Sequence, residues 1–296
     1  MTPFPALRWH AARFGSYFWR FSTLPLVRRL AAGTPRPFVL KRRFHGQELA
    51  VDLSRTDTHR LLFLEGERFV LESEILQELL APGMCVVDVG ANIGYYALLF
   101  SSVVGPAGSV VCLEPEPENL EELRHNIAIN GLGNVSLLPI AAGSTDTVLS
   151  LKRGLNAVVV HEGGNMSVDV KRLDSLDLER VDLIKLDVEG YECEVLEGAR
   201  GLLEKQRPSL FVEVHPDLLP SRDKLRWIGD LLKELYGSVT AHRHRHATSV
   251  LEKARQRYLG RGSVESSDDA DAWIDEAIAA PGTEPFWLVT HRPGLG

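Results

Sequence analysis

Short apolar runs alternate with segments whose apolar residues recur at helical spacing over most of the chain. A short run predicts a buried strand, and the helical spacing predicts an amphipathic helix. Regular alternation of the two is typical of parallel β-α-β units. The expected strands are Met84–Val89, Ser109–Leu113, Val135–Ile140, Val181–Leu186 and Ser209–Val214, and the expected helices are Ile93–Val104, Pro117–Asn130, Tyr191–Glu204 and Lys224–Tyr236.

The segment that precedes the first of these strands has a different pattern. Residues 38–53 predict a hairpin that turns at His45-Gly46-Gln47. Residues 67–80 predict an amphipathic helix that ends at Ala81-Pro82-Gly83. We therefore assign residues 38–83 to a lead-in hairpin and helix.

Two later regions depart from the alternation. Between residues 142 and 179 a polar, glycine-containing stretch predicts a strand pair at Ala157–Val160 and Ser167–Val170, and excursions of this kind near strand tips usually face substrate. We assign residues 84–296 to one main domain with an insertion at about 244–284. The C-terminal elements expected are an antiparallel pair, Ser238–His242 with Phe286–Thr290, and between them a basic helix, Thr248–Leu259, and an acidic tract, Glu265–Asp271.

Charge is distributed unevenly along the chain. Residues 1–47 contain nine Lys or Arg and no Asp or Glu, which leaves 24 basic against 40 acidic residues in the remainder, a balance of −16. The first 37 residues are also rich in aromatic side chains. They form a basic aromatic arm that either packs on its own domain or makes peripheral contact with an anionic membrane surface or a partner. The acidic body would repel phosphate, so we expect no nucleic-acid partner.

Composition bounds the class of protein. Hydrophobic residues make up 44% and charged residues 25% of the 296 positions, as is ordinary for a globular protein with one large domain and extensions. Its three cysteines, Cys85, Cys112 and Cys193, form no C-x-x-C pattern. They predict core thiols in a reducing compartment, with no disulfide and no zinc. We therefore expect a cytoplasmic protein, which is membrane-peripheral if the arm binds lipid.

The turn after the first core strand is typical of a nucleotide-cofactor loop. It reads Asp88-Val-Gly-Ala-Asn-Ile-Gly-Tyr-Tyr96, and its glycines let a ligand approach N–H groups at the start of the following helix. A dinucleotide fingerprint would have glycine where this loop has Asn92, a position at which a side chain obstructs the pyrophosphate. S-adenosylmethionine (SAM) has no pyrophosphate, and Glu114, which closes the next strand, offers a carboxylate for its ribose. A tight turn in another doubly wound fold is the alternative.

Taken together, several motifs resemble the FkbM family of SAM-dependent methyltransferases over about residues 38–216. The resemblance implies the α/β class I methyltransferase fold, which is Rossmann-like: a seven-stranded, mostly parallel sheet with helices on both faces and a reversed last strand. It also implies transfer of a methyl group to a hydroxyl of a sugar, polyketide or other secondary-metabolite or glycoconjugate acceptor. The motifs are Asp88–Tyr96, Leu113-Glu-Pro115, Leu173-Asp-Ser-Leu176, Ile184–Glu192, Val195-Leu-Glu-Gly-Ala199 and Glu213-Val-His-Pro216.

The same resemblance implies which residues bind the cofactor. The loop residues would face the methionine part of SAM, Glu114 the ribose hydroxyls, and Ala141 and Ala142 the adenine. On the helix after Glu114, Asn119 and Asn126 are interpreted as surface capping residues. The full set of cofactor-binding residues expected is Asp88, Gly90, Ala91, Asn92, Gly94, Tyr95, Glu114, Pro115, Ala141 and Ala142.

Methyl transfer to an alcohol needs a proton acceptor or a cation, because the pKa of the hydroxyl is far above neutral. Asp187 follows one strand, while Glu213 and His215 lie two apart at the end of the next, so all three are expected at the carboxyl edge of the sheet. In the favoured mechanism His215 is the general base, Glu213 orients it or binds substrate, and Asp187 lies between cofactor and substrate. In the rival mechanism Asp187 and Glu213 hold a divalent cation such as magnesium. Glu189 has a simpler interpretation as an acid at a helix N-terminus.

A second function from another class is compatible with the same motifs. The chain would then be a SAM-binding, non-catalytic interaction module that the basic aromatic arm recruits to a membrane or synthase complex. A nicotinamide oxidoreductase is a more distant third. The sequence does not predict the acceptor or the oligomeric state.

Overall fold

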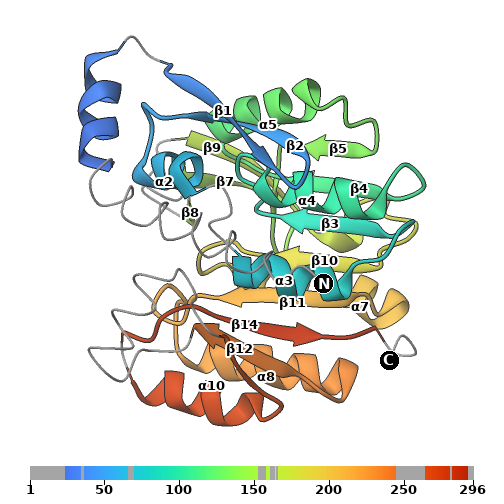
Figure 1. Cartoon of the computed structure of the whole chain (residues 1–296). Coiled ribbons are helices and arrows are strands. Elements are labelled where there is room, and N and C mark those ends of the chain that lie inside the picture. The colour runs from blue at the N-terminus through green and yellow to red at the C-terminus, as the bar shows by residue number, and fades with distance from the viewer. Residues whose placement is uncertain are drawn as a thin grey trace, which may run out of the picture. The chain divides into compact units, whose positions relative to one another are not determined.

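The computed structural model describes residues 24–34, 37–65, 70–152, 158–160, 164, 166–244, 264–280 and 282–292. The chain divides into two compact units, residues 1–73 with 244–264 and residues 74–243 with 265–296, which are described separately below (Figure 1). Most of the predicted arm and the predicted helix Thr248–Leu259 lie outside the described residues.

In the first unit, the predicted hairpin is confirmed. Strand β1 (Val39–Phe44) pairs antiparallel with β2 (Gln47–Asp52), and Phe44 lies opposite Gln47. The turn between the strands has positive φ at His45 and Gly46, as a two-residue hairpin turn requires. Helix α2 (Asp57–Glu65), which the sequence analysis did not predict, follows directly.

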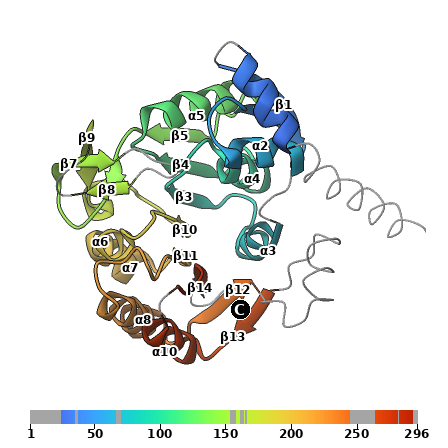
Figure 2. The same ribbon diagram turned by 90° about the vertical axis from the view of Figure 1, so that its left-hand side faces the viewer.

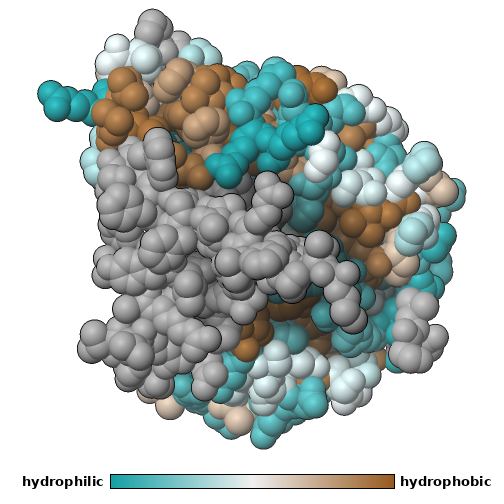
Figure 3. All heavy atoms as spheres, in the orientation of Figure 1, coloured by the Kyte–Doolittle hydropathy of each residue, from teal (hydrophilic) through white to brown (hydrophobic). Residues whose placement is uncertain are grey.

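A helical segment at residues 24–33 precedes the hairpin. Leu26 and Leu30 on this segment are 55% and 54% exposed. Apolar residues gather over this part of the first unit in the space-filling view (Figure 3). Arg28, between them, forms an ion pair with Asp57 at the start of α2.

The second unit is built on one mixed sheet. The expected parallel strands with a reversed last strand are confirmed: β14 pairs antiparallel with β11 and is itself flanked by β12. The order across the sheet is β13-β12-β14-β11-β10-β3-β4-β5. The strands are β3 (Cys85–Val89), β4 (Ser109–Leu113), β5 (Val135–Leu138), β10 (Leu183–Leu186), β11 (Ser209–Val214), β12 (Thr240–His244), β13 (Val264–Ser267) and β14 (Phe286–Thr290).

Among the described residues the sheet has eight strands rather than the seven expected, because part of the acidic tract pairs with the basic strand β12. Arg243 on β12 lies 3.2 Å from Glu265 on β13, and the Nδ1 atom of His242 lies 2.9 Å from the hydroxyl of Ser266. The rest of that tract begins an unpredicted helix, α10 (Ala270–Ala279), which Asp269 caps by accepting the N–H of Ala272.

Helices cover both faces of this sheet, as expected. Figure 2 shows α4 on one side and α6, α7 and α8 on the other. The predicted helix at residues 191–204 is in fact two, because the chain bends at Ala199. These two helices are α6 (Glu192–Gly198) and α7 (Arg200–Gln206). Four other helices run close to their expected bounds: α3 (Val70–Leu79), α4 (Tyr95–Val104), α5 (Pro117–Ile129) and α8 (Asp223–Tyr236).

The central strands are buried on both faces, which is why they read as nearly continuous apolar runs. All four residues of β10 are buried, as are five of the six in β11. None of the helices in the described part of the chain has the length and apolar character needed to cross a bilayer. The three cysteines are free thiols.

The excursion after β5 forms a small separate sheet, and the strand pair predicted there is wrong. Segments β8 and β9 do not pair with each other, because β7 lies between them and pairs with both through Ser150. The buried side chain of Leu151 packs with Val168 and Val170, which holds β7 in this place. The strands, in the order β6-β9-β7-β8, are β6 (Ala141–Ala142), β7 (Thr147–Lys152), β8 (Val158–Val160) and β9 (Met166–Lys171), and a short 3-10 helix, η1 (Leu173–Ser175), follows.

Candidate active site

The loop between β3 and α4 is fixed to the carboxyl end of the neighbouring strand. Gly90, Asn92 and Gly94 all have positive φ, of 82°, 50° and 92°. The N–H groups of Gly90 and Ala91 both donate to the carbonyl of Leu113, the last residue of β4, over 3.0 and 3.1 Å. This loop therefore has one defined conformation, although it contains two glycines.

The glycines of the loop are needed for packing against protein as well as for their φ values. A Cβ atom on Gly90 would collide with the main-chain carbonyl of Asp187, and one on Gly94 would lie 2.6 Å from the side chain of Leu123. The loop thus lies directly against Asp187, the predicted catalytic residue that follows β10.

Glu114 lies beside this loop, and its side chain is 4% exposed. Its carboxylate accepts the N–H of Asn92 over 2.8 Å, the N–H of Glu116 over 2.9 Å and the amide of Asn119 over 3.3 Å. Burial raises the pKa of Glu114 to about 7, although these three hydrogen bonds oppose the rise. The carboxylate is therefore oriented by the turn that begins at Asp88.

The interpretation of Asn119 and Asn126 as surface residues is wrong. Asn126 is fully buried and donates to the carbonyl of Ile93 over 2.8 Å. Asn119 is 7% exposed and donates to Glu114. Because both residues lie on α5, this helix reaches the loop region through them. Asn126 fixes the main chain at Ile93, and Asn119 fixes the carboxylate of Glu114.

The other predicted cofactor residues lie in several elements. Ala91 and Tyr95 are buried in the loop and the first turn of α4, and Pro115 is half-buried after Glu114. Ala141 and Ala142 are buried in β6, which belongs to the small sheet. Their alignment toward a common ligand stays a prediction.

Asp88 is completely buried in β3, and its two carboxylate oxygens have no hydrogen-bond partner within the described residues. The nearest charge is the ammonium of Lys185, 3.5 Å away on β10. Burial raises the pKa of Asp88, and Lys185 opposes this rise. The sequence analysis did not single out Lys185, whose only signal was a basic residue inside an apolar run.

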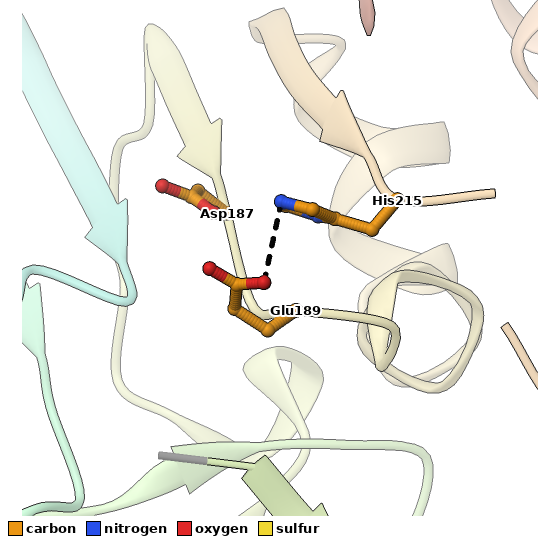
Figure 4. A group of neighbouring side chains, drawn as sticks. All are labelled: Asp187, Glu189 and His215. Atoms are coloured by element: carbon orange, nitrogen blue, oxygen red, sulfur yellow. Dashed lines mark ion pairs between the residues drawn. The ribbon is translucent and has the colours of Figure 1, made fainter. Parts of the chain in front are cut away.

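His215, just after β11, is surrounded by carboxylates. Its Nδ1 atom lies 3.0 Å from Oε1 of Glu192, and its Nε2 atom lies 3.4 Å from Oε2 of Glu189 and 3.9 Å from Oε1 of Glu213. Figure 4 shows the side chains of Asp187, Glu189 and His215 directed toward a common space. The predicted convergence of Asp187, Glu213 and His215 at this edge is thus present, and Glu189 belongs to the same group.

The charges around His215 change its ionisation. Burial lowers the pKa of the ring, but the hydrogen bond to Glu192 and the charges of Glu189, Asp187 and Glu213 outweigh it and raise the pKa to about 9. Burial also raises the pKa of Glu189, against the effect of His215. Near neutral pH the ring is mostly an imidazolium.

The turn that supplies these carboxylates has an unusual backbone. Glu189 and Gly190 both have positive φ, of 53° and 93°, and a Cβ on Gly190 would meet the main chain of Leu218. Glu192, at the start of α6, is fully buried and accepts the N–H of Gly190 over 2.9 Å as well as His215 Nδ1. Sequence reasoning missed Glu192, because only the packing of α6 beside β11 shows that it orients the ring.

A cation is the other means of activating a hydroxyl here. Within the described residues, one group of potential ligands, Asp187, Glu189 and His215, brings three donor atoms within 4.8 Å of one another. The cation ligands expected from the sequence are Asp187 and Glu213, whereas this group contains Glu189 and not Glu213. However, Lys185 lies 3.3 Å from Asp187, so one carboxylate of the group already has a cationic partner.

The residues present fit SAM as the cofactor. Glu114 supplies a buried carboxylate for a ribose, and its oxygens retain acceptor capacity beyond the three bonds they accept. Asp88 supplies two buried oxygens without hydrogen-bond partners at the base of the loop. Both features suit a ligand with a hydroxylated sugar at one end and positive charge at the other.

The strand order, the loop after β3 and the acid after β4 define a class I SAM-dependent methyltransferase fold. The chain belongs to the family described as the methyltransferase FkbM domain, whose model matches residues 88–258, more than half of the chain. This confirms the resemblance found in the sequence.

Three relatives illustrate the similarity. Methyltransferase sdnD of Sordaria araneosa is 31% identical over an alignment of 154 residues, and the match covers 38% of this chain and 59% of that protein. The 2-O-methyltransferase NoeI of Sinorhizobium fredii is 27% identical over 185 residues, 54% of this chain and 75% of that protein. The hexuronic acid methyltransferase AglP of Haloferax volcanii is 28% identical over 169 residues, 54% of this chain and 67% of that protein. The chain thus spans under two thirds of sdnD.

Proposed function

We propose that this protein transfers the methyl group of SAM to a hydroxyl of a sugar, polyketide or other secondary-metabolite or glycoconjugate acceptor. The observation that carries the proposal is the orientation of His215: Glu192 binds Nδ1, and Nε2 is left facing the space beside Asp187 and Glu189. The names of NoeI and AglP, an O-methyltransferase and a hexuronic acid methyltransferase, support oxygen and a sugar as acceptor.

SAM supplies a methyl group that is already activated for displacement, so the chain mainly positions the reactants and removes a proton. We assign the proton acceptor to Nε2 of neutral His215. As the acceptor oxygen forms its bond to the methyl carbon, the carbon–sulfur bond breaks, its electron pair stays on sulfur, and the hydroxyl proton passes to the ring. Glu192 holds the ring and stabilises the imidazolium that forms, as a carboxylate does in other histidine-based sites.

The other predicted residues have supporting roles in this proposal. Glu213 binds substrate or steadies the ring from 3.9 Å, and Asp187 lies between cofactor and acceptor. Glu114 binds the ribose hydroxyls, and the loop from Gly90 to Tyr95 takes the methionine part. For the arm at residues 1–37 both predictions stay open: it packs on its own domain, or it makes peripheral contact with a membrane or partner.

The experiment has two parts. Purified protein is incubated with SAM and a panel of hexuronic acid glycosides, neutral sugars and polyketide alcohols, and mass spectrometry identifies acceptors that gain one methyl group. For the acceptor found, we expect His215→Gln to lose turnover by about a hundredfold or more while calorimetry shows unchanged SAM affinity. The matched control is His291→Gln, an exposed histidine at the end of β14.

Other outcomes separate the alternatives. SAM binding without turnover on any acceptor favours the non-catalytic interaction module. Loss of activity after treatment with a chelator, with recovery on adding Mg²⁺ or Mn²⁺, favours the cation mechanism at Asp187. If His215→Gln keeps full turnover and the enzyme is insensitive to chelator, both mechanisms are wrong.

A further inference from the structure

Lys185 is the only buried side chain among the lysines and arginines that the structure describes, with 1% of its surface exposed. It lies in the middle of β10 and is in register with Asp88 on β3. Burying an ammonium is costly unless it is paired. Its position directly beneath the cofactor loop therefore calls for an explanation that the proposed mechanism does not give.

The ammonium of Lys185 joins the cofactor loop to the catalytic edge of the sheet. Its Nζ atom lies 3.3 Å from Oδ2 of Asp187, 3.4 Å from the carbonyl of Gly90 and 3.5 Å from Oδ1 of Asp88. It also lies 4.9 Å from the ring centroid of Tyr96, the distance of a cation–π contact. One cation thus holds three pieces of chain that meet at this loop.

The charges of this group do not balance. Two carboxylates, Asp88 and Asp187, share the single ammonium of Lys185, and neither oxygen of Asp88 has a hydrogen-bond partner in the described part of the chain. The three side chains together carry one excess negative charge. Asp88 is fully buried and the side chain of Asp187 is 26% exposed, so the excess charge in this largely enclosed group is unfavourable until a positive ligand compensates it.

SAM and its product S-adenosylhomocysteine differ in one charge, because loss of the methyl group converts a sulfonium to a neutral thioether. We propose that Asp88, Lys185 and Asp187 form a charge-selective cluster that favours the sulfonium cofactor over the thioether product. The inference rests on SAM being the cofactor and deepens the proposed function. Lys185 is a positioning residue in it: its single ammonium lies within 3.5 Å of both carboxylates and compensates only one of their two charges.

This role explains why a lysine is present instead of an apolar residue. Without it, the fully buried carboxylate of Asp88 would have no cation beside it, which is unfavourable for a charged group. The carboxylates of Asp187 and Asp88 in turn raise the pKa of Lys185, although burial opposes this. The pair Asp88–Lys185 is neutral, and the charge of Asp187 remains for the cofactor.

The test is equilibrium binding, so no turnover is required. Calorimetry gives the ratio of the Kd for S-adenosylhomocysteine to the Kd for SAM in the full chain. Asp88→Asn removes the excess charge, and we expect this ratio to fall about tenfold, the effect of about 1.4 kcal/mol. The double variant Asp88→Asn with Lys185→Met removes a neutral pair, so its ratio returns to within about twofold of the wild-type value.

A matched control and a second variant guard against effects of misfolding. Asp182→Asn removes another buried carboxylate, just before the opposite end of β10, where it pairs with Arg180, and should leave the ratio unchanged. Asp187→Asn, whose side chain is 26% exposed, also removes one negative charge and should lower the ratio even if Asp88→Asn does not fold.

The outcomes are distinct for the two proposals. The cluster is not charge-selective if a folded Asp88→Asn or Asp187→Asn variant binds both ligands with the wild-type ratio, or if the double variant behaves like Asp88→Asn alone. A wild-type chain that binds neither SAM nor its product would instead overturn the proposed function.

Discussion

Replacing Glu192 by glutamine tests whether His215 accepts the proton during methyl transfer. The new side chain keeps an oxygen that can accept from Nδ1 of His215 and from the N–H of Gly190, as Glu192 does. It removes the negative charge closest to the ring. We therefore expect the pKa of His215 to fall while the ring keeps its orientation.

The size of the change follows from the surroundings of the ring. Burial lowers the pKa of His215, yet the hydrogen bond to Glu192 and three further carboxylates bring it from 6.5 to about 9, a difference of about 3 kcal/mol in favour of the imidazolium. A hydrogen bond to a charged partner is worth about 1 kcal/mol more than one between neutral groups. Glu192→Gln should thus move the titration toward acid by about one pH unit.

Two measurements check this expectation. If the neutral ring accepts the proton, kcat/KM for the acceptor rises with pH and levels off above the pKa of His215. The profile of Glu192→Gln should level off about one pH unit earlier than that of the wild type, and NMR titration of the ring should move equally. Glu194→Gln, on the same helix but paired with Lys224, is the control. A moved NMR titration with an unmoved kcat/KM profile would refute His215 as the base.

The same pKa makes a prediction about stability. Since the folded-state pKa of His215 lies above its ordinary value, the imidazolium stabilises the fold fully below pH 6.5, and this contribution disappears as pH rises through about 9. Urea unfolding at pH 6 and pH 9.5 should therefore show a smaller difference for Glu192→Gln than for the wild type. A difference of the same size in both would contradict the pairing of Glu192 with a charged ring.

Two further predictions concern the cofactor loop. Glu114→Gln should weaken SAM and S-adenosylhomocysteine by the same factor, about tenfold to a hundredfold from lost charged hydrogen bonds, and calorimetry that shows weakening of SAM alone would contradict a ribose contact. Because the pKa of Glu114 is raised from 4.5 to about 7, its protonated form stabilises the fold below pH 4.5, and this contribution is lost as pH rises through 7. In urea unfolding, the free energy of the Glu114→Gln variant should not show this decrease. Gly90→Ala, with φ of 82° and a Cβ that collides with the carbonyl of Asp187, should cost more than about 3 kcal/mol of unfolding free energy. Gly83→Ala, at φ 81° with open space around it, should cost only about 1 kcal/mol, and equal losses would show that the collision is unimportant.

The sequence predicts the elements of the central sheet well because their signals are local. Strands β4 and β11 have the expected bounds, since each is a mostly apolar run between breaks in the pattern. Strand β7 escapes prediction because its neighbours, not its own residues, determine that it lies between β8 and β9. The end strand β13 escapes for the same reason, because Glu265 and Ser266 gain their partners Arg243 and His242 from the distant strand β12.

The candidate site divides in the same way. The loop and Glu114 follow from residue type and spacing, because main-chain conformation limits what can stand at each position. Glu192 and Lys185 do not follow, since their roles arise from contacts with His215 and Asp88 on other elements. A lysine inside an apolar run nevertheless indicates a buried charge, and a search for carboxylates on the adjacent strands would have found its partners.

The excess negative charge near Lys185 and the raised pKa of His215 lead to one more prediction. The carboxylates that face the ring are Asp187, Glu189, Glu192 and Glu213, and Asp187 also belongs to the charge-selective cluster. A sulfonium bound beside Asp187 opposes their combined effect, so NMR titration of the ring should show a lower pKa with SAM bound than with S-adenosylhomocysteine bound. The neutral ring would then be most abundant in the complex that is ready to react. Once the methyl group has left, the imidazolium would lose its proton less easily. Equal ring titrations in the two complexes would mean that the cofactor's charge does not reach His215, and the base would have to work at the alkaline pKa of the free protein.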